Sequence, residues 1–228
     1  MRHPRPATLL PALLLFAGLA AVAVPAFAER KVVVGAESKN FPLEGARRLK
    51  LDVAVGDVRV EAGGGDRIEA KLELRCSTTS RRCRERAAEL HLTPTRSGDD
   101  LSLRLHGYDR EERHGMHHPE VDLRLVVPAS LALFVDMGVG ELEVDGVEGD
   151  VTVDLGVGEA SVRVPEGAVR SVALDVGVGE AQLSPRQDES HHSGFLFLGN
   201  EVDWRDGVGA SRIVVDIGVG EAQVRLLP

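Results

Sequence analysis

The chain has 228 residues with 36 acidic and 27 basic side chains, which give a formal net charge of −9 at pH 7. Such a surface repels nucleic acid and anionic lipid headgroups, so neither is expected as a partner. Because aromatic residues make up only 4% of the chain, the core has to be built from aliphatic side chains.

The N-terminus has the three-part pattern of a secretory signal peptide. Arg2 and Arg5 precede an apolar run at 9–24, and an Ala-Phe-Ala segment at 26–28 supplies the small residues of a cleavage site. We therefore expect residues 1–28 to be removed during export to the periplasm, the cell surface or the medium. The apolar run is short for a membrane span of about 20 residues, and no comparable run follows, so no transmembrane anchor is expected.

The two cysteines, Cys76 and Cys83, are expected to form a disulfide. Export to an oxidising compartment favours the bond, and the short loop that it closes gives about 2–3 kcal/mol in the chain-entropy model. Their C-x6-C spacing differs from the C-x-x-C of catalytic dithiols. A structural bridge is therefore favoured over a redox site.

Residues 29–128 are expected to form an N-terminal β region that contains this disulfide. Alternating apolar residues and turn residues predict strands at 47–62, 66–75, 90–95, 100–106 and 121–127, and one short helix at 80–90. Pro128 ends the last of these strands and marks a soft boundary with the rest of the chain.

A six-residue motif recurs beyond this boundary, which is the signature of a repeat architecture. It reads Asp-x-Gly-Val-Gly-Glu, with close copies at 136–141, 154–159, 175–180 and 216–221. A fainter copy, Asp-Val-Ala-Val-Gly-Asp, stands upstream at 52–57. The first two close copies are 154 − 136 = 18 residues apart, so one repeat is long enough for two short strands and a turn.

Within each repeat, apolar residues alternate with polar or small ones. In the second close copy these apolar residues are Val151, Val153, Leu155 and Val157, and period-2 alternation predicts that all four are buried. The Gly-Glu step then separates two strands, because glycine allows the chain to bend without a Cβ clash. The predicted corners are the equivalent glycines of all five copies: Gly56, Gly140, Gly158, Gly179 and Gly220.

The fold class predicted from these patterns is all-β. One coil of strand, bend, strand and turn cannot bury its own apolar face, whereas stacked coils can. We therefore expect residues 129–228 to form a solenoid-like stack of β-coils, with an insertion loop at 184–206. A single domain over 29–228 is the alternative to a boundary at Pro128.

The chain resembles a known family in this arrangement. The segment Val121-Asp-Leu-Arg-Leu-Val-Val-Pro128, the repeated Gly-x-Gly-acid steps and a final strand pair at 213–226 are similar to the putative-adhesin family of bacterial envelope β-strand-repeat proteins, a domain of unknown function. The resemblance implies a right-handed β-helix-like, or toast-rack, stack. Its motifs are architectural, and it implies no catalytic residues.

Histidines in two predicted loops are the candidate metal ligands. His114, His117 and His118 lie in one loop, and His191 and His192 lie in the other. Imidazoles in an oxidising compartment would suit Zn²⁺, Cu²⁺ or Ni²⁺, which makes a periplasmic metal-binding protein one alternative function. No spaced signature such as H-E-x-x-H is present, so solvated loops are the competing interpretation.

In-register stacking would also align the acidic residues of the motif. The aspartates would form one column and the glutamates another, with neighbours about 4.8 Å apart. Bound Ca²⁺ would relieve the repulsion within each column. The nine-residue motif of Ca²⁺-binding β-rolls is absent, so solvated surface charges are favoured and no resident cofactor is expected.

The sequence contains no motif of a nucleophilic or phosphate-binding site, such as G-x-S-x-G or a P-loop. We therefore expect a non-enzymatic cell-envelope protein, adhesin-like or a scaffold, whose partner is an envelope protein or polysaccharide. A polysaccharide-active β-helix enzyme is the second alternative. Phe195, Phe197 and Trp204 are the candidate partner contacts, and capping of the core is their competing role.

Overall fold

The structure, a computed structural model, describes residues 31–107, 118–186, 189–193 and 199–228. The expected signal peptide lies outside the described residues. Within them the chain forms twelve strands and one α-helix, α1 (Arg81–Ala87), which confirms the all-β prediction. The strands are β1 (Lys31–Pro42), β2 (Arg48–Gly63), β3 (Arg67–Ser77), β4 (His91–Ser97), β5 (Asp100–His106), β6 (Glu120–Pro128), β7 (Ala132–Asp145), β8 (Val151–Pro165), β9 (Val169–Arg186), β10 (Glu189–Ser193), β11 (Asn200–Trp204) and β12 (Ser211–Leu227).

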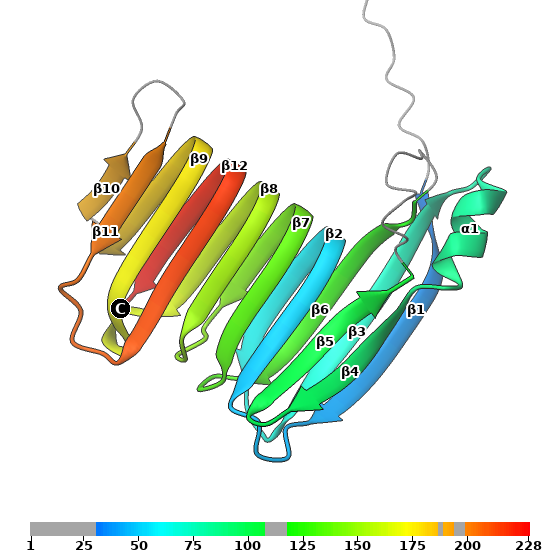
Figure 1. The fold of residues 1–228 in the computed structure, drawn as a ribbon, viewed down its shortest axis with the longest axis horizontal. Helices are drawn as coiled ribbons and strands as arrows, with labels where there is room; N and C mark the ends of the chain where they lie inside the picture. Colours follow the sequence, from blue (N-terminus) through cyan, green and yellow to red (C-terminus); the bar gives the residue numbers. More distant parts are fainter. Residues whose placement is uncertain (1–30, 108–117, 187–188, 194–198) are drawn as a thin grey trace, which may run out of the picture.

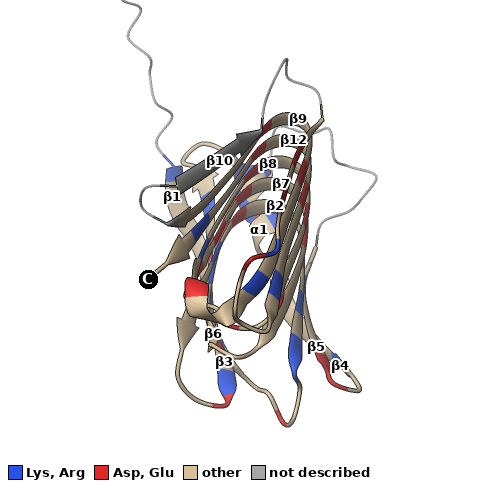
Figure 2. Cartoon of the chain, turned by 90° about the vertical axis from the view of Figure 1, so that its left-hand side faces the viewer, with Lys and Arg blue, Asp and Glu red and all other residues tan. Residues whose placement is uncertain are grey.

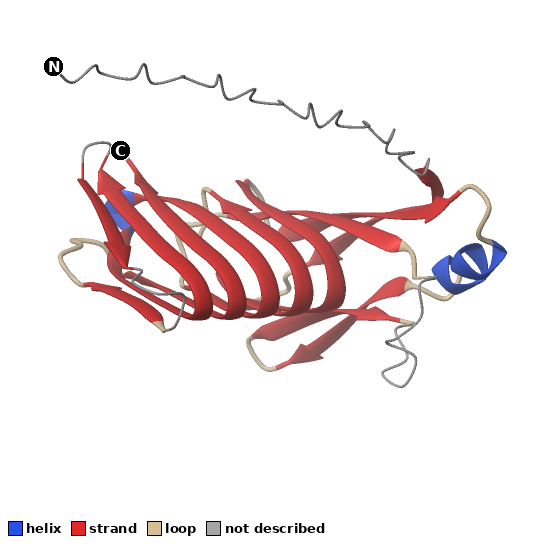
Figure 3. Cartoon of the chain, turned by 90° about the horizontal axis from the view of Figure 1, so that it is seen from above, coloured by secondary structure: helices blue, strands red, loops and turns tan. Residues whose placement is uncertain are grey.

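Five long strands, β2, β7, β8, β12 and β9, each belong to two faces of one folded sheet. β2 shows this most clearly, because its first half pairs with β5, its second half pairs with β6, and both halves pair with β7. The view in Figure 3 shows the same strands as parallel curves that turn from one face to the other. β7, β8, β12 and β9 run unbroken through the Gly-Val-Gly segment, where the sequence predicted two separate strands. β2 runs unbroken through the equivalent segment at 54–56, as the predicted strand at 47–62 does.

The core lies between the two faces and is almost entirely aliphatic. Val153 and Val176 are fully buried, as the alternation predicts. One cluster of buried side chains extends from Phe41 to Leu226 and includes residues on both sides of Pro128. Because β2 and β7 pair over most of their length, the N-terminal region and the repeats share one sheet and one core.

The order of the strands differs from that of a simple solenoid. Along the sheet the order is β2-β7-β8-β12-β9, so the last strand of the sequence lies between β8 and β9 (Figure 1). The repeat makes this exchange possible, because Asp216 of β12 stands opposite both Asp154 and Asp175 in matching register. The segment before β12 passes close to the start of β9, where a Cβ on Gly207 or Gly209 would overlap backbone atoms.

The predicted insertion loop at 184–206 contains two strands that cover one end of the stack. β10 pairs antiparallel with the second half of β9, and β11 pairs with its first half. The side chain of Asn200, in β11, is buried and donates a hydrogen bond to the carbonyl oxygen of Gly179. Trp204, also in β11, packs partly buried against the core, in a position suited to capping.

The opposite end of the molecule holds the disulfide and the helix. Cys76 in β3 is bonded to Cys83 in α1, with their Cα atoms 5.9 Å apart, and both predictions are confirmed. The hydroxyl of Ser80 caps the helix by accepting a hydrogen bond from the backbone N–H of Cys83 at 3.3 Å. β1, which the sequence analysis did not predict, pairs antiparallel with β3 and forms the edge of the sheet.

Candidate functional site

The corner of each long strand exposes an apolar side chain. In β7, Met137 and Leu142 are both buried although they are an odd number of residues apart, so the alternation changes phase between them. Val139, which lies between the two glycines of this corner, is exposed as a result. Val157 is the equivalent residue in β8 and is 47% exposed, so the prediction that it is buried is wrong.

These valines form a continuous line, which we call the valine ridge. Neighbouring strands pair them in register, and each is between 41% and 47% exposed. Four strand spacings of about 4.8 Å make the ridge about 19 Å long. In the order of the strands its members are Val55, Val139, Val157, Val219 and Val178.

The glycines beside the valines allow the strands to approach one another at the corner. Gly158 has a φ of +146°, and an added Cβ would overlap the carbonyl oxygen of Gly140 on the neighbouring strand. The other glycine of this corner, Gly156, is also confined, because a Cβ there would lie 2.6 Å from the carbonyl oxygen of Gly138. All five predicted corner glycines, Gly56, Gly140, Gly158, Gly179 and Gly220, lie at the bends with positive φ.

Two rows of carboxylates run along the two sides of the valine ridge, and Figure 2 shows them in red on the long strands. The Asp ladder pairs in register across β2, β7, β8, β12 and β9, and the Glu ladder does the same beyond the corner. The Asp ladder consists of Asp52, Asp136, Asp154, Asp216 and Asp175. The Glu ladder consists of Asp57, Glu141, Glu159, Glu221 and Glu180.

Most of the ladder carboxylates have no cation beside them. Arg104 is bound to Asp52 at 2.6 Å, at one end of the Asp ladder. In the parts of the chain that the structure describes, six ladder residues form no ion pair: Asp154, Asp175, Asp216, Glu141, Glu159 and Glu221. The corner therefore concentrates negative charge on both sides of an apolar line.

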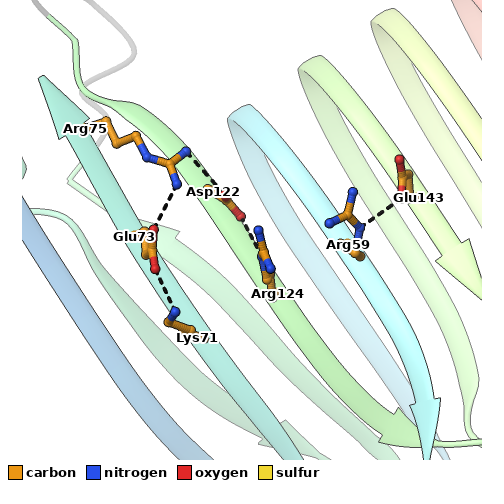
Figure 4. A network of polar contacts seen from close by, with 7 residues as sticks. All are labelled: Arg59, Lys71, Glu73, Arg75, Asp122, Arg124 and Glu143. Carbon is orange, nitrogen blue, oxygen red and sulfur yellow. Dashed lines mark hydrogen bonds and ion pairs between the residues drawn. The ribbon is translucent and has the colours of Figure 1, made fainter. Parts of the chain in front are cut away.

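The adjoining surface is charged but compensated. In the row that follows the Glu ladder, Arg59 of β2 bonds to Glu143 of β7 at 2.8 Å (Figure 4). Arg163 of β8 bonds to Asp145 at 3.0 Å. The hydrogen bond from Arg59 lowers the pKa of Glu143. Among the described residues, cations therefore pair with the carboxylates beyond the Glu ladder, whereas Asp154, Asp216, Glu159 and Glu221 of the two central strands have no ion pair.

Burial and neighbouring carboxylates raise the pKa of one residue in each ladder. Partial burial, together with the neighbouring carboxylates of Asp175 and Asp154, raises the pKa of Asp216 above its ordinary value near 3.8. At the β2 end of the Glu ladder, partial burial raises the pKa of Asp57, and the nearby carboxylates of Glu120 and Asp122 add to the rise. The charged form of these groups is therefore disfavoured in the folded protein.

We expect Asp216→Asn to raise the melting temperature at pH 7. A raised pKa means that the folded state binds the proton more tightly than the unfolded state, so stability falls as the pH rises through the window above 3.8. The asparagine removes this cost at neutral pH and should have little effect at about pH 3, where Asp216 is protonated in both states. Thermal unfolding of both proteins at the two pH values measures the difference.

Asp206→Asn is the control, because Asp206 is exposed and lies outside the ladders. A melting temperature of Asp216→Asn at or below that of the wild type at pH 7 would show that the ladder carries no electrostatic cost.

The candidate metal ligands are not brought together among the described residues. His114 and His117 lie outside the description, and the side chain of His118 contacts Arg86. His191 and His192 lie in β10, which is six strand spacings of about 4.8 Å, or about 29 Å, from β6, the strand that follows His118. No group of three potential metal ligands occurs in the described part of the chain.

A hollow of about 270 Å³ on the outer side of the first face is the second candidate site. Its lining includes the aromatic side chain of Phe134 and the cations Lys50 and Arg104. Carboxylates already bind both cations: Lys50 contacts Asp100 at 2.6 Å, and Arg104 contacts Asp52. The hollow therefore offers fewer charged groups without an ion-pair partner than the corner does among the described residues.

Of the three candidate partner contacts, only Trp204 lies among the described residues. Phe195 and Phe197 lie outside the described residues, and Trp204 packs against the core. Sequence reasoning missed the valine ridge, although the Gly-Val-Gly segments that produce it are visible in every close copy. In the described segments, no helix has the length and apolarity of a membrane span.

The chain shares its fold with one of the solved structures compared. A putative cell adhesion protein from Clostridium sporogenes superposes with a TM-score of 0.52 at 14% identity, over 85% of this chain and 99% of the other. Weaker likenesses are a putative adhesin from Bacteroides fragilis (TM-score 0.28, 10% identity, 83% and 97% covered) and a putative lipid binding protein from Parabacteroides distasonis (0.27, 11%, 57% and 66%). The sequence matches no protein-family model and no curated protein. The first of these likenesses identifies the fold alone.

Proposed function

We propose that this protein is a non-enzymatic, adhesin-like module of the bacterial cell envelope, in which a stack of β-coils presents a repetitive surface to another macromolecule. The observation that carries the proposal is the valine ridge, which keeps five apolar side chains exposed in register. Scattered surface valines need no explanation, but a contiguous exposed apolar strip indicates an interaction surface. The shared fold with a putative cell adhesion protein supports the same role.

The position of the ridge strengthens this interpretation. The three central valines, Val139, Val157 and Val219, lie on strands that are paired with a neighbouring strand on both sides at the corner. A position on an edge strand therefore does not explain why these valines are exposed. The exposure of the ridge results from the bend at the confined glycines, which flank the valine on both sides in β7, β8, β12 and β9 and on one side in β2.

We also propose that residues 1–28 are a cleaved signal peptide and that residues 29–228 fold as one domain in the periplasm or at the cell surface. The disulfide and the common core of the described residues support this proposal. Intact mass of the exported protein would show a chain that begins at Glu29. A chain that retains residues 1–28 after cell fractionation would contradict it.

Binding of the labelled mature chain to envelope fragments of the producing bacterium tests the function. We expect saturable binding, and we expect the double substitution Val157→Ser and Val219→Ser to weaken it several-fold. Val33→Ser and Val208→Ser form the matched control, since both valines are exposed and lie outside the ridge. Equal loss in the two double variants, or no saturable binding by the wild type, would rule out the ridge as the contact surface.

A further inference from the structure

We propose that the valine ridge and its two acidic ladders bind a cationic polypeptide segment, rich in Lys or Arg, of another envelope macromolecule. This inference rests on the proposed function of the ridge and adds the chemistry of the partner. Charge, apolar exposure and length each contribute to the argument.

The negative charge of the corner is not explained by protection of a sheet edge. Carboxylates about 4.8 Å apart repel each other. Six of those in the ladders form no ion pair among the described residues: Asp154, Asp175, Asp216, Glu141, Glu159 and Glu221. Acidic residues on edge strands prevent aggregation, but the corner segments of β7, β8 and β12 are not edges, because a neighbouring strand pairs with each of them on both sides. A cationic partner would neutralise the two ladders together.

The apolar ridge selects a particular kind of cation. Lys and Arg side chains have aliphatic stems that lie on apolar surface while their charged ends reach outward. On this corner the stems would contact the valines, and the charged ends would reach the Asp ladder on one side and the Glu ladder on the other. A small inorganic cation would use the carboxylates and leave the valines exposed.

The length of the ridge sets the size of the segment. About 19 Å corresponds to about six residues of extended chain at about 3.3 Å per residue. A contact of this size along an exposed surface is expected to be weak, fast and strongly dependent on ionic strength.

A second copy of this chain is a poor occupant of the same surface. Two ridges placed together would bring acidic ladders of both molecules into contact, and juxtaposed like charges oppose association. The compensated row at Arg59, Glu143 and Arg163 is not available as a source of cations, because its guanidinium groups are held by carboxylates.

Fluorescence anisotropy with a labelled peptide tests the inference. The probe is a peptide of about six residues in which Lys and Val alternate, and the comparison peptide carries Glu in place of Lys. We expect the mature chain to bind the Lys peptide alone and to lose most of this binding between about 0.02 M and 0.5 M salt.

Two sets of variants locate the contact. Combined Asp154→Asn, Asp216→Asn and Asp175→Asn should weaken binding at least tenfold, and Val157→Ser with Val219→Ser should weaken it several-fold. The charge control combines Glu61→Gln, Glu69→Gln and Glu148→Gln, which removes the same number of exposed charges outside the ladders. The apolar control is Val33→Ser with Val208→Ser.

Several outcomes would overturn the inference. These are no binding of the Lys peptide, equal binding of the Glu peptide, an equal loss in variant and control, or a dimer in sedimentation that the ridge variants dissociate. If the chain binds envelope fragments through the ridge but does not bind the Lys peptide, the proposed function stands and the cationic partner is excluded.

Discussion

Gly158→Ala is expected to destabilise the protein by about 3–5 kcal/mol or to prevent folding. At this position the backbone has a φ of +146°, which side chains other than glycine rarely adopt, and the added methyl group would overlap the carbonyl oxygen of Gly140. The overlap is with backbone that is itself held between two strands, so no flexible group can move aside. Chemical denaturation followed by circular dichroism measures the loss.

Gly167→Ala is the matched control for this substitution. Gly167 lies in the short 3-10 turn, Glu166–Ala168, where an added Cβ has no atom within 4 Å and φ is not positive. The alanine should therefore change the stability by no more than about 1 kcal/mol, in either direction. Equal stability of the two alanine variants would show that the corner accommodates a side chain that its geometry excludes.

Leu155→Ala is expected to cost about 2–5 kcal/mol, whereas Val157→Ala should cost less than about 0.5 kcal/mol. The two residues lie two positions apart in β8, and strict alternation would give them the same environment. In the structure Leu155 is buried and Val157 is 47% exposed. Urea unfolding of both variants measures the difference directly.

The same pair of variants tests where the strand changes phase. Comparable losses of stability would place Val157 in the core, contrary to the corner geometry. They would also remove the valine ridge on which the proposed function depends.

The sequence predicted what depends on local pattern. Alternating residues located β2 to β6 to within a few positions, and Ser80 marked the start of α1. The alternation also located the segments of β7, β8 and β12, although each is one strand where two were predicted. Cys76 and Cys83 were paired correctly, because no other cysteine was available. The recurrence of the motif also predicted that equivalent residues would stand side by side, as Gly158 and Gly140 do.

What the sequence did not predict depends on contacts between distant segments. Val157 fits the buried phase by its spacing, and only the direction of the corner reveals that it faces solvent. The order β8-β12-β9 cannot be read from the repeats, because identical motifs allow any copy to pair with any other. β10 lies within a polar stretch of the sequence and β11 is short, and both are strands because β9 offers them an edge.

The candidate site was foreseen in part. The two acidic columns were expected from the motif, and the structure shows both as ladders on the long strands. Their relation to the valines was missed, since the sequence assigned Val157 to the interior. Sequence therefore provided the charges of the surface, and the bend at the glycines provided the apolar line between them.

The central place of β12 has a consequence for how the molecule assembles. Pairing of β7 with β8 joins residues only 151 − 133 = 18 positions apart, but pairing of β8 with β12 joins residues 213 − 151 = 62 positions apart. Until β12 pairs with β8 and β9, the slot between these two strands is empty, and strand pairing cannot extend across it. Since contacts between distant residues slow folding, we expect closure of this slot to be a slow step of folding, as is the pairing of β2 with β7, which joins residues 132 − 48 = 84 positions apart.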